Sequence, residues 1–203
     1  DTPGGRVGLK GGTPKRVWHA SGQAAAVDTQ GNALALIHVD FHTLGAIQFC
    51  GNLTAPRPAF RELKRFNTEY MSSHEFGKVR EVRFKSGDGQ PLHSWIITPP
   101  DFRKGKKYPA IIEIHGGPRS QYGRLFFHEM QYLAASGYVV MFTNPRGSQG
   151  YGREFADAIT AKWGSVDFED LMAAADLLEK QPFVDKKRIG VTGGSYGGYL
   201  TNI

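Results

Sequence analysis

The sequence is poor in cysteine and in long apolar runs. Its 203 residues include a single cysteine, Cys50, which excludes an internal disulfide and argues against a metal site built on cysteines. A lone cysteine is compatible with a reducing compartment, so a cytoplasmic location is favoured, although no targeting signal fixes it. The longest apolar runs, at residues 33–37 and 110–112, are far shorter than the roughly 20 residues that span a bilayer. We therefore expect no transmembrane segment and no membrane partner.

The amino terminus also lacks the features of a natural start. Residues 1–5 contain no initiator methionine, and no basic segment followed by an apolar one, as a signal peptide would have. We expect the sequence to begin at a cut rather than at the start of a natural protein.

The net charge of +6 is modest and is not concentrated in a tail. The densest basic cluster, residues 103–107, lies between two expected strands, and no stacking aromatic residues alternate with its lysines. This pattern is typical of a solvated loop. We expect no nucleic-acid partner, and the composition does not predict an oligomeric state.

Residues 1–69 are predicted to be all-β. Short β-rich runs recur along this part of the chain, at residues 17–19, 24–27, 33–39 and 46–50. Residues 28–32 give a hairpin turn between the second and third runs. Four short strands make one blade of a β-propeller, and a blade needs neighbours to cover its faces. We expect residues 1–69 to be the C-terminal remnant of a propeller, with a polar linker beginning near Arg61.

Residues 70–203 follow a different pattern, which predicts an incomplete α/β domain. Two alternating runs, 79–85 and 91–98, flank an Asp-Gly pair and predict a hairpin. Apolar strands follow at 110–114 and 138–142 with a helical stripe between them, which makes a βαβ unit. A second amphipathic helix is marked by Phe168, Leu171, Met172, Ala175 and Leu178. The acidic residues Asp167, Glu169 and Asp170 lie in its first turn and suit the helix dipole.

The chemistry is predicted to centre on residues 193–199. A β-branched run at 188–192 precedes Ser195 and a plausible helix follows it, so Ser195 would lie at a sharp turn between strand and helix. At such a turn the serine hydroxyl projects, and side chains two residues away would collide, which explains Gly193 and Gly197. This arrangement is the nucleophile elbow of the α/β-hydrolase fold.

Attack by a serine on a carbonyl needs hydrogen-bond donors for the developing oxyanion. The backbone N–H of Tyr196 is one candidate, because it follows the nucleophile. The second donor is expected from the loop that contains Gly116 and Gly117, where glycine permits close backbone approach. His115 precedes the serine and is interpreted as a structural residue that anchors this loop, since the base of such an enzyme follows the serine.

Other candidate sites lack essential residues. The helix at 128–132 begins like a zinc-binding His-Glu-x-x-His segment but has tyrosine in place of the second histidine. Residues 147–152 lack the spacing of phosphate-binding loops. Asn52 begins a glycosylation sequon, which is interpreted as a turn. We expect neither a metal nor a cofactor.

The motifs of residues 70–203 resemble those of the prolyl oligopeptidase family of serine peptidases, particularly its bacterial dipeptidyl- and acylaminoacyl-peptidase branch. The matching stretches are residues 95–99, 113–118, 144–152, 163–167 and 193–199. The resemblance implies that Ser195 is the acylated nucleophile and that the N–H groups of Tyr196 and Gly117 form the oxyanion hole. It also implies that residues 1–69 end a β-propeller that restricts access to short peptides.

The sequence departs from the family pattern after the serine. Family members continue for roughly a hundred residues and carry the triad Asp and His there, in the order Ser, Asp, His. Only eight residues follow Ser195, and none of them is Asp or His. We therefore expect a chain truncated just after the elbow, inactive by itself and with an apolar open sheet edge. A non-catalytic interaction module and an esterase or lipase on the same fold remain alternatives.

Overall fold

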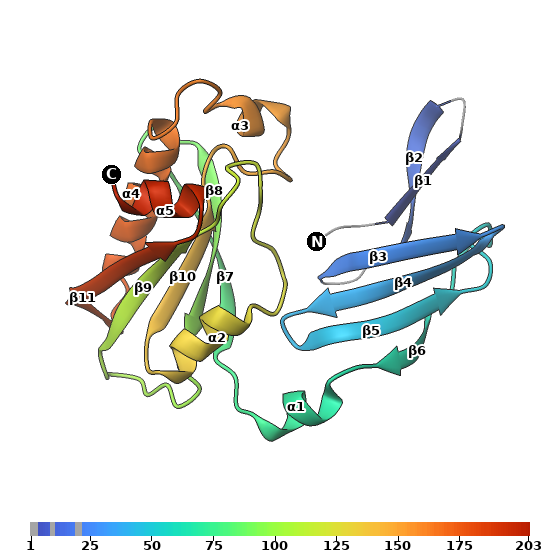
Figure 1. The fold of residues 1–203 in the computed structure, drawn as a ribbon, viewed down its shortest axis with the longest axis horizontal. Coiled ribbons are helices and arrows are strands. Elements are labelled where there is room, and N and C mark those ends of the chain that lie inside the picture. The colour runs from blue at the N-terminus through green and yellow to red at the C-terminus, as the bar shows by residue number, and fades with distance from the viewer. Residues whose placement is uncertain (1–3, 9–10, 19–21) are drawn as a thin grey trace. The chain divides into compact units, whose positions relative to one another are not determined.

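The computed structural model describes residues 4–8, 11–18 and 22–203. Its contacts divide the chain into two compact units, one up to His74 together with Gly123–Phe127, the other Glu75–Tyr122 with His128–Ile203 (Figure 1). The boundary between residues 69 and 70 stays a prediction. The expectation of a cut end was made on residues 1–5, of which 1–3 lie outside the described residues, as does His19, predicted as the end of a strand.

The first unit is built from antiparallel strands. A two-stranded sheet pairs β1 (Gly4–Gly8) with β2 (Gly11–Trp18). A four-stranded sheet has the order β3-β4-β5-β6 and consists of Gln23–Gln30, Ala33–Asp40, Thr43–Cys50 and Arg61–Arg65. Trp18 of β2 packs with Leu34 and Leu36 of β4 in the buried cluster of this unit. The alternation of buried and exposed positions along β4 fits a sheet with one packed face.

The polar stretch that begins at Arg61 corrects the sequence prediction of a linker. Arg61–Arg65 is strand β6, paired with β5, and helix α1 (Thr68–Ser73) follows it. All five β6 residues are exposed, so no apolar alternation marks this strand. Charged residues are common on edge strands, where they discourage pairing with another chain. Trp18 lies in β2, outside the four-stranded sheet in which its run was predicted.

The second unit is a five-stranded mixed sheet with the order β11-β9-β10-β8-β7. Its strands are β7 (Lys78–Lys85), β8 (Pro91–Thr98), β9 (Tyr108–Ile114), β10 (Val139–Asn144) and β11 (Val184–Gly193). The pairs β7/β8 and β8/β10 are antiparallel, which confirms the predicted hairpin, whereas β9 runs parallel to both β10 and β11. The carboxyl ends of β9, β10 and β11 therefore meet at one edge, where ligands bind in α/β sheets.

Helices accompany this sheet: α2 (His128–Ala135), α3 (Arg153–Asp157), α4 (Val166–Glu179) and α5 (Tyr196–Thr201) (Figure 1). Every residue of β10 is buried. On one face of β9, Ala110, Ile112 and Ile114 join the core together with Leu171 of α4 and Leu200 of α5. The elbow is thereby attached to the main apolar core.

Several local predictions are refined by the structure. The helical stripe predicted between the two apolar strands is helix α2, which begins at His128, and the short helix α3 was not predicted. Met172 was assigned to the apolar stripe of α4 but is 49% exposed. Asp167 and Asp170 are fully buried, and each accepts a hydrogen bond from a side chain of another segment, the Tyr196 hydroxyl and the Arg146 guanidinium respectively.

Two loop predictions are confirmed. Residues 103–107, which hold the basic cluster, lie between β8 and β9, and all five are exposed. At the sequon, the Asn52 side-chain oxygen accepts hydrogen bonds from the backbone N–H and the hydroxyl of Thr54, which forms a turn. Among the described residues, no helix is long and apolar enough to cross a bilayer.

Candidate active site

Ser195 lies between strand β11, which ends at Gly193, and helix α5, which begins at Tyr196. Its φ is 57° and its ψ is −118°, a backbone conformation that a residue with a side chain rarely adopts. The turn is closed by a hydrogen bond from the Gly197 N–H to the Gly194 carbonyl, 2.9 Å long. Strain of this kind persists only where the surroundings impose it, and it gathers at functional sites.

Two glycines allow the elbow to pack against the end of β9. A Cβ on Gly197 would lie 2.0 Å from the carbonyl oxygen of Ile114, and a Cβ on Gly193 would lie 2.7 Å from the same oxygen. Backbone atoms cannot move aside as the end of a side chain can. Both positions therefore require glycine, whereas a Cβ on the neighbouring Gly194 would meet nothing within 4 Å.

The loop after β9 approaches the serine directly. A Cβ on Gly116 would lie 3.2 Å from Ser195 Cβ and 3.7 Å from Ser195 Oγ. Among the described residues, the backbone N–H groups of Gly117 and Tyr196 donate to no hydrogen-bond acceptor. The first N–H groups of a helix have no partner within it, which accounts for Tyr196. Two free donors thus lie in the segments on either side of the serine hydroxyl.

His115 anchors the same loop from its buried side. Its Nδ1 lies 2.7 Å from the carbonyl oxygen of Gly116 and its Nε2 lies 2.8 Å from Ser148 Oγ, in the loop after β10. Burial lowers the pKa of His115, so the imidazole is neutral. Tyr122 packs edge-on against the ring at 5.1 Å. His115 therefore connects the loops that follow β9 and β10.

Further hydrogen bonds hold these two loops together. The side-chain amide of Asn144 exchanges two hydrogen bonds with the backbone of Tyr122, of 2.7 Å and 3.0 Å. The Gln149 N–H donates to the Ser120 carbonyl at 2.9 Å. Because Asn144 ends the fully buried strand β10, these hydrogen bonds attach the loop that carries Gly117 to the core of the sheet.

Arg146 fixes the loop after β10 to helix α4. Its guanidinium donates to both carboxylate oxygens of Asp170, at 2.7 Å and 2.9 Å, and also to Asp88 of the β7–β8 turn. The hydrogen bonds to Asp170 keep the pKa of Arg146 above its usual value. A two-pronged pair of this kind restrains orientation as well as position.

Tyr196 is restrained by its side chain as well as its backbone. Its hydroxyl donates to Asp167 Oδ2 at 2.5 Å, and its ring meets Trp163 edge-on at 5.2 Å. Burial, followed by the neighbouring Asp167 carboxylate, raises the pKa of Tyr196. Residues 163–167 were noted in the sequence only for their resemblance to a family motif. Trp163 and Asp167 of this motif both contact Tyr196, the residue that follows Ser195.

Glu113 is a buried acidic residue of β9, in the run that the sequence predicts as an apolar strand. It is 7% exposed, and its Oε2 has no hydrogen-bond partner among the described residues. Burial, with a smaller contribution from Glu129, raises the pKa of Glu113 to about 7. A charged residue flanked by isoleucines on a β-strand gives no sequence signal that its side chain is buried.

No base is positioned at the serine by the residues that the structure describes. Within that part of the chain, no histidine or carboxylate is hydrogen-bonded to the Ser195 hydroxyl. Over the same residues, no group of three or more His, Cys, Asp or Glu side chains is arranged to hold a metal ion.

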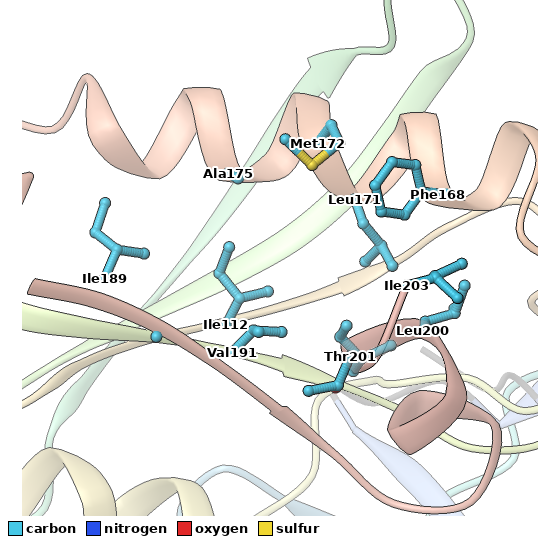
Figure 2. Close-up of a pocket in the computed structure, with 12 residues that line it drawn as sticks. Ile112, Phe168, Leu171, Met172, Ala175, Ile189, Val191, Leu200, Thr201 and Ile203 are labelled. Carbon is cyan, nitrogen blue, oxygen red and sulfur yellow. The ribbon is translucent and has the colours of Figure 1, made fainter.

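Two hollows are lined by segments that neighbour the elbow in the chain or in the sheet. One, of about 400 Å³, is bounded by Gly117, Pro118 and Arg119 and by residues 156–163. The other, of about 280 Å³, is an apolar groove between helix α4, strand β11 and helix α5 (Figure 2). We call it the β11 groove. Its walls include Ile112, Phe168, Leu171, Met172, Ala175, Ile189, Val191, Leu200, Thr201 and Ile203.

Comparisons with known proteins show similarity to a family of peptidases. Residues 124–203 match the model of the prolyl oligopeptidase family. Peptidase YuxL of Bacillus subtilis is 42% identical over 143 residues, which are 70% of this chain and 22% of that protein. Dipeptidyl-peptidase 5 of Porphyromonas gingivalis is 38% identical over 117 residues, which are 57% of this chain and 17% of that protein.

Solved structures extend the likeness to nearly the whole chain. Acylaminoacyl peptidase of Pyrococcus horikoshii covers 94% of the chain with a TM-score of 0.83 and 31% identity, and 30% of that protein is matched. An acylaminoacyl peptidase bound to Z-Gly-Gly-Phe-chloromethyl ketone gives the same TM-score with 32% identity, over 94% of this chain and 30% of that one.

The chain therefore spans about a fifth of the length of the curated relatives it matches. Its fold is α/β: part of an α/β-hydrolase domain, preceded in the chain by the end of a β-propeller. The elbow and the loop after β10 lie within residues 124–203, which match the family model. By this sequence and structural evidence, residues 124–203 match the prolyl oligopeptidase family, and the chain is similar to peptidases of known structure over nearly its whole length.

Proposed function

We propose that Ser195 is the nucleophile of a serine peptidase that cleaves short peptides through an acyl-enzyme. One observation carries this proposal: Ser195 has a strained elbow conformation beside Gly116, and the free N–H groups of Gly117 and Tyr196 flank it. A Gly-rich structural turn would need neither the strain nor two unused donors.

The chemistry follows from that arrangement. Ser195 Oγ attacks the carbonyl carbon of the peptide bond while its hydroxyl proton passes to a base, and the π electrons move onto the carbonyl oxygen; the base later gives that proton to the leaving amine. The two N–H groups stabilise that oxyanion, and each such donor contributes on the order of 10²–10³ in rate. The C–N bond then breaks, the amine leaves with a proton, and the acyl group stays on Oγ until water hydrolyses the ester.

The 203 residues are proposed to supply the nucleophile and the oxyanion donors, but not the base. In this fold the triad partners follow the serine in the chain, and residues 196–203 contain neither Asp nor His. Without a base, an oxyanion hole and substrate binding alone leave a rate of about 10³–10⁴ over water. Residues 1–203 alone are therefore expected to be inactive as a peptidase.

A peptide substrate is supported by the relatives and by the space beside the site. The matched proteins are named as peptidases, and one solved neighbour holds a peptide chloromethyl ketone. The hollow of about 400 Å³ beside Gly117 is within the size range of small-ligand sites and offers room for a residue next to the scissile bond.

The test uses the complete gene product that contains this sequence, as wild type and as Ser195→Ala. Hydrolysis of an aminoacyl anilide should fall by at least about 10³-fold in the variant. Ser136→Ala, at an exposed serine after helix α2, is the matched control and should retain wild-type activity. Anilide hydrolysis that survives in Ser195→Ala contradicts the proposal. Turnover of a simple acyl ester without any anilide hydrolysis indicates an esterase instead.

A further inference from the structure

The backbone strain at Ser195 needs a restraint from outside the turn. A residue in a sparsely populated backbone conformation keeps it only where its neighbours are held in place. On the amino-terminal side lies Gly194, where an added Cβ would meet nothing within 4 Å. A glycine without close neighbours restrains the chain little. The restraint on the carboxyl-terminal side, where helix α5 begins at Tyr196, is therefore decisive.

Helix α5 is too short to supply that restraint by itself. It has six residues, and isolated helices of this length are not stable in water. Gly197 contacts the end of β9 and Leu200 lies in the apolar core, but neither contact is directional. A directional contact at the first residue of α5 is needed to fix the orientation of the helix beside the serine.

The Tyr196 side chain makes that directional contact, with helix α4. A carboxylate only accepts hydrogen bonds, so the Tyr196 hydroxyl donates to Asp167 Oδ2, at 2.5 Å. The Gly164 N–H approaches the same oxygen at 3.4 Å, and Asp167 Oδ1 has no partner among the described residues. Because Asp167 is fully buried, water does not compete for the carboxylate. Hydrogen bonds to an ionised group are roughly twice as strong as neutral ones.

The anchored tyrosine shares a peptide group with the serine, and ψ of Ser195 sets the plane of that peptide. Its carbonyl accepts the Tyr199 N–H at 3.1 Å, within α5. Among the described residues only the bond before Pro118 is cis, so this peptide is trans and its N–H points opposite to its carbonyl. The Tyr196 N–H is therefore directed out of the amino-terminal end of α5. Its orientation and the ψ of Ser195 change together.

We propose that Asp167 is a positioning residue: its hydrogen bond to the Tyr196 hydroxyl orients the first turn of α5 and so maintains the strained conformation of Ser195. This inference rests on the proposed function of Ser195. Asp167 is fully buried and does not touch the substrate. It acts through Tyr196 and the peptide group that joins Tyr196 to the serine.

A double variant of the complete gene product removes this hydrogen bond without leaving a buried carboxylate or hydroxyl unpaired. In Tyr196→Phe/Asp167→Leu both partners become apolar groups of similar size, a replacement that can be nearly neutral for stability. We expect kcat to fall roughly 10–100-fold, the factor that strain at one residue is worth, with KM within about 2-fold of wild type. The melting temperature should stay within about 5 °C of wild type.

Two single variants and a control complete the comparison. Asp167→Asn keeps an oxygen acceptor for the Tyr196 hydroxyl and should retain kcat within about 5-fold of wild type. Tyr196→Phe removes the donor alone and should lose as much kcat as the double variant, so the comparison does not depend on the folding of Asp167→Leu. Tyr132→Phe, at an exposed tyrosine of α2, is the control for loss of a phenolic hydroxyl and should retain wild-type kcat. The rate of fluorophosphonate labelling at Ser195 should follow kcat, because this small probe does not need the peptide-binding site.

The outcomes distinguish this inference from the proposed function. Loss of turnover in Ser195→Ala, combined with wild-type kcat in the double variant, overturns the positioning role alone. An equal fall in kcat in Asp167→Asn and Tyr196→Phe, or a rise in KM without a fall in kcat, also overturns it. Turnover that persists in Ser195→Ala overturns the proposed function and this inference with it. A fall in kcat confined to the variants that lack the hydrogen bond, with KM and melting temperature of the double variant unchanged, supports it.

Discussion

On one side of Ser195 the loops after β9 and β10 are held by buried polar side chains, whereas on the other side the β11 groove is apolar and open among the described residues. The polar side includes Arg146, Asp170 and Ser148, each at most 9% exposed. The groove side includes Met172 and Val191, which are 49% and 47% exposed. The difference indicates that orientation at the site depends on hydrogen bonds, while the groove contributes little to it.

The largest expected effect comes from breaking the polar side. Asp170→Asn leaves the buried Arg146 guanidinium with only part of its charge compensation, so the free energy of unfolding should fall by about 3–5 kcal/mol. Asp157→Asn removes a partner of the exposed Arg119, and because solvent screens this pair the free energy of unfolding should stay nearly unchanged. Urea unfolding of the complete gene product measures both. Equal losses would mean that burial of the pair confers no special role.

The next effect concerns the elbow itself. Gly197→Ala places a methyl group against the Ile114 carbonyl and should destabilise by about 3 kcal/mol, at the upper end of overpacking costs. Gly194→Ala meets open space and should change stability by less than about 1 kcal/mol. The same unfolding measurement compares the two. A harmless Gly197→Ala would show that the elbow does not pack on β9 as described.

Glu113 is an exception among the buried polar groups, because its Oε2 has no hydrogen-bond partner among the described residues. Its pKa is about 7 in the folded protein against an ordinary value of 4.5, raised mainly by burial and further by Glu129. Between those pH values the unfolded chain releases the proton while the folded protein keeps it, so stability falls as pH rises toward 7.

Glu113→Gln removes this penalty. Relative to wild type, the variant should be about 1–3 kcal/mol more stable at pH 8 and nearly equal in stability at pH 4.5. Unfolding curves at the two pH values measure the difference, in which all other titrating groups cancel. A stabilisation that is the same at both pH values would argue against a protonated Glu113.

The smallest effect is expected in the β11 groove. Met172→Gln changes an exposed side chain and should alter stability by less than about 0.5 kcal/mol, whereas Leu171→Gln, one position away and 6% exposed, should cost several kcal/mol. A large cost in Met172→Gln would mean that the groove is covered in solution. In that case the contrast between the two sides of Ser195 would no longer hold.

Sequence alone predicted the features that local pattern determines. The elbow at Ser195 and the glycine loop at Gly116 carry their own turn chemistry, and the buried strands carry continuous apolar runs. Strand β6 was missed because an exposed edge strand needs no apolar alternation. Sequence did not reveal the partners of Arg146, Tyr196 and Ser148, because each lies on a distant segment that only the folded sheet brings near.

The most direct measurement of the central claim is the site at which a fluorophosphonate probe reacts with the complete gene product. The account predicts one phosphonylated residue, Ser195, located by peptide mass spectrometry, and no labelling in Ser195→Ala. Labelling of a different serine, or none in a folded wild-type protein, would contradict the assignment of Ser195 as the nucleophile.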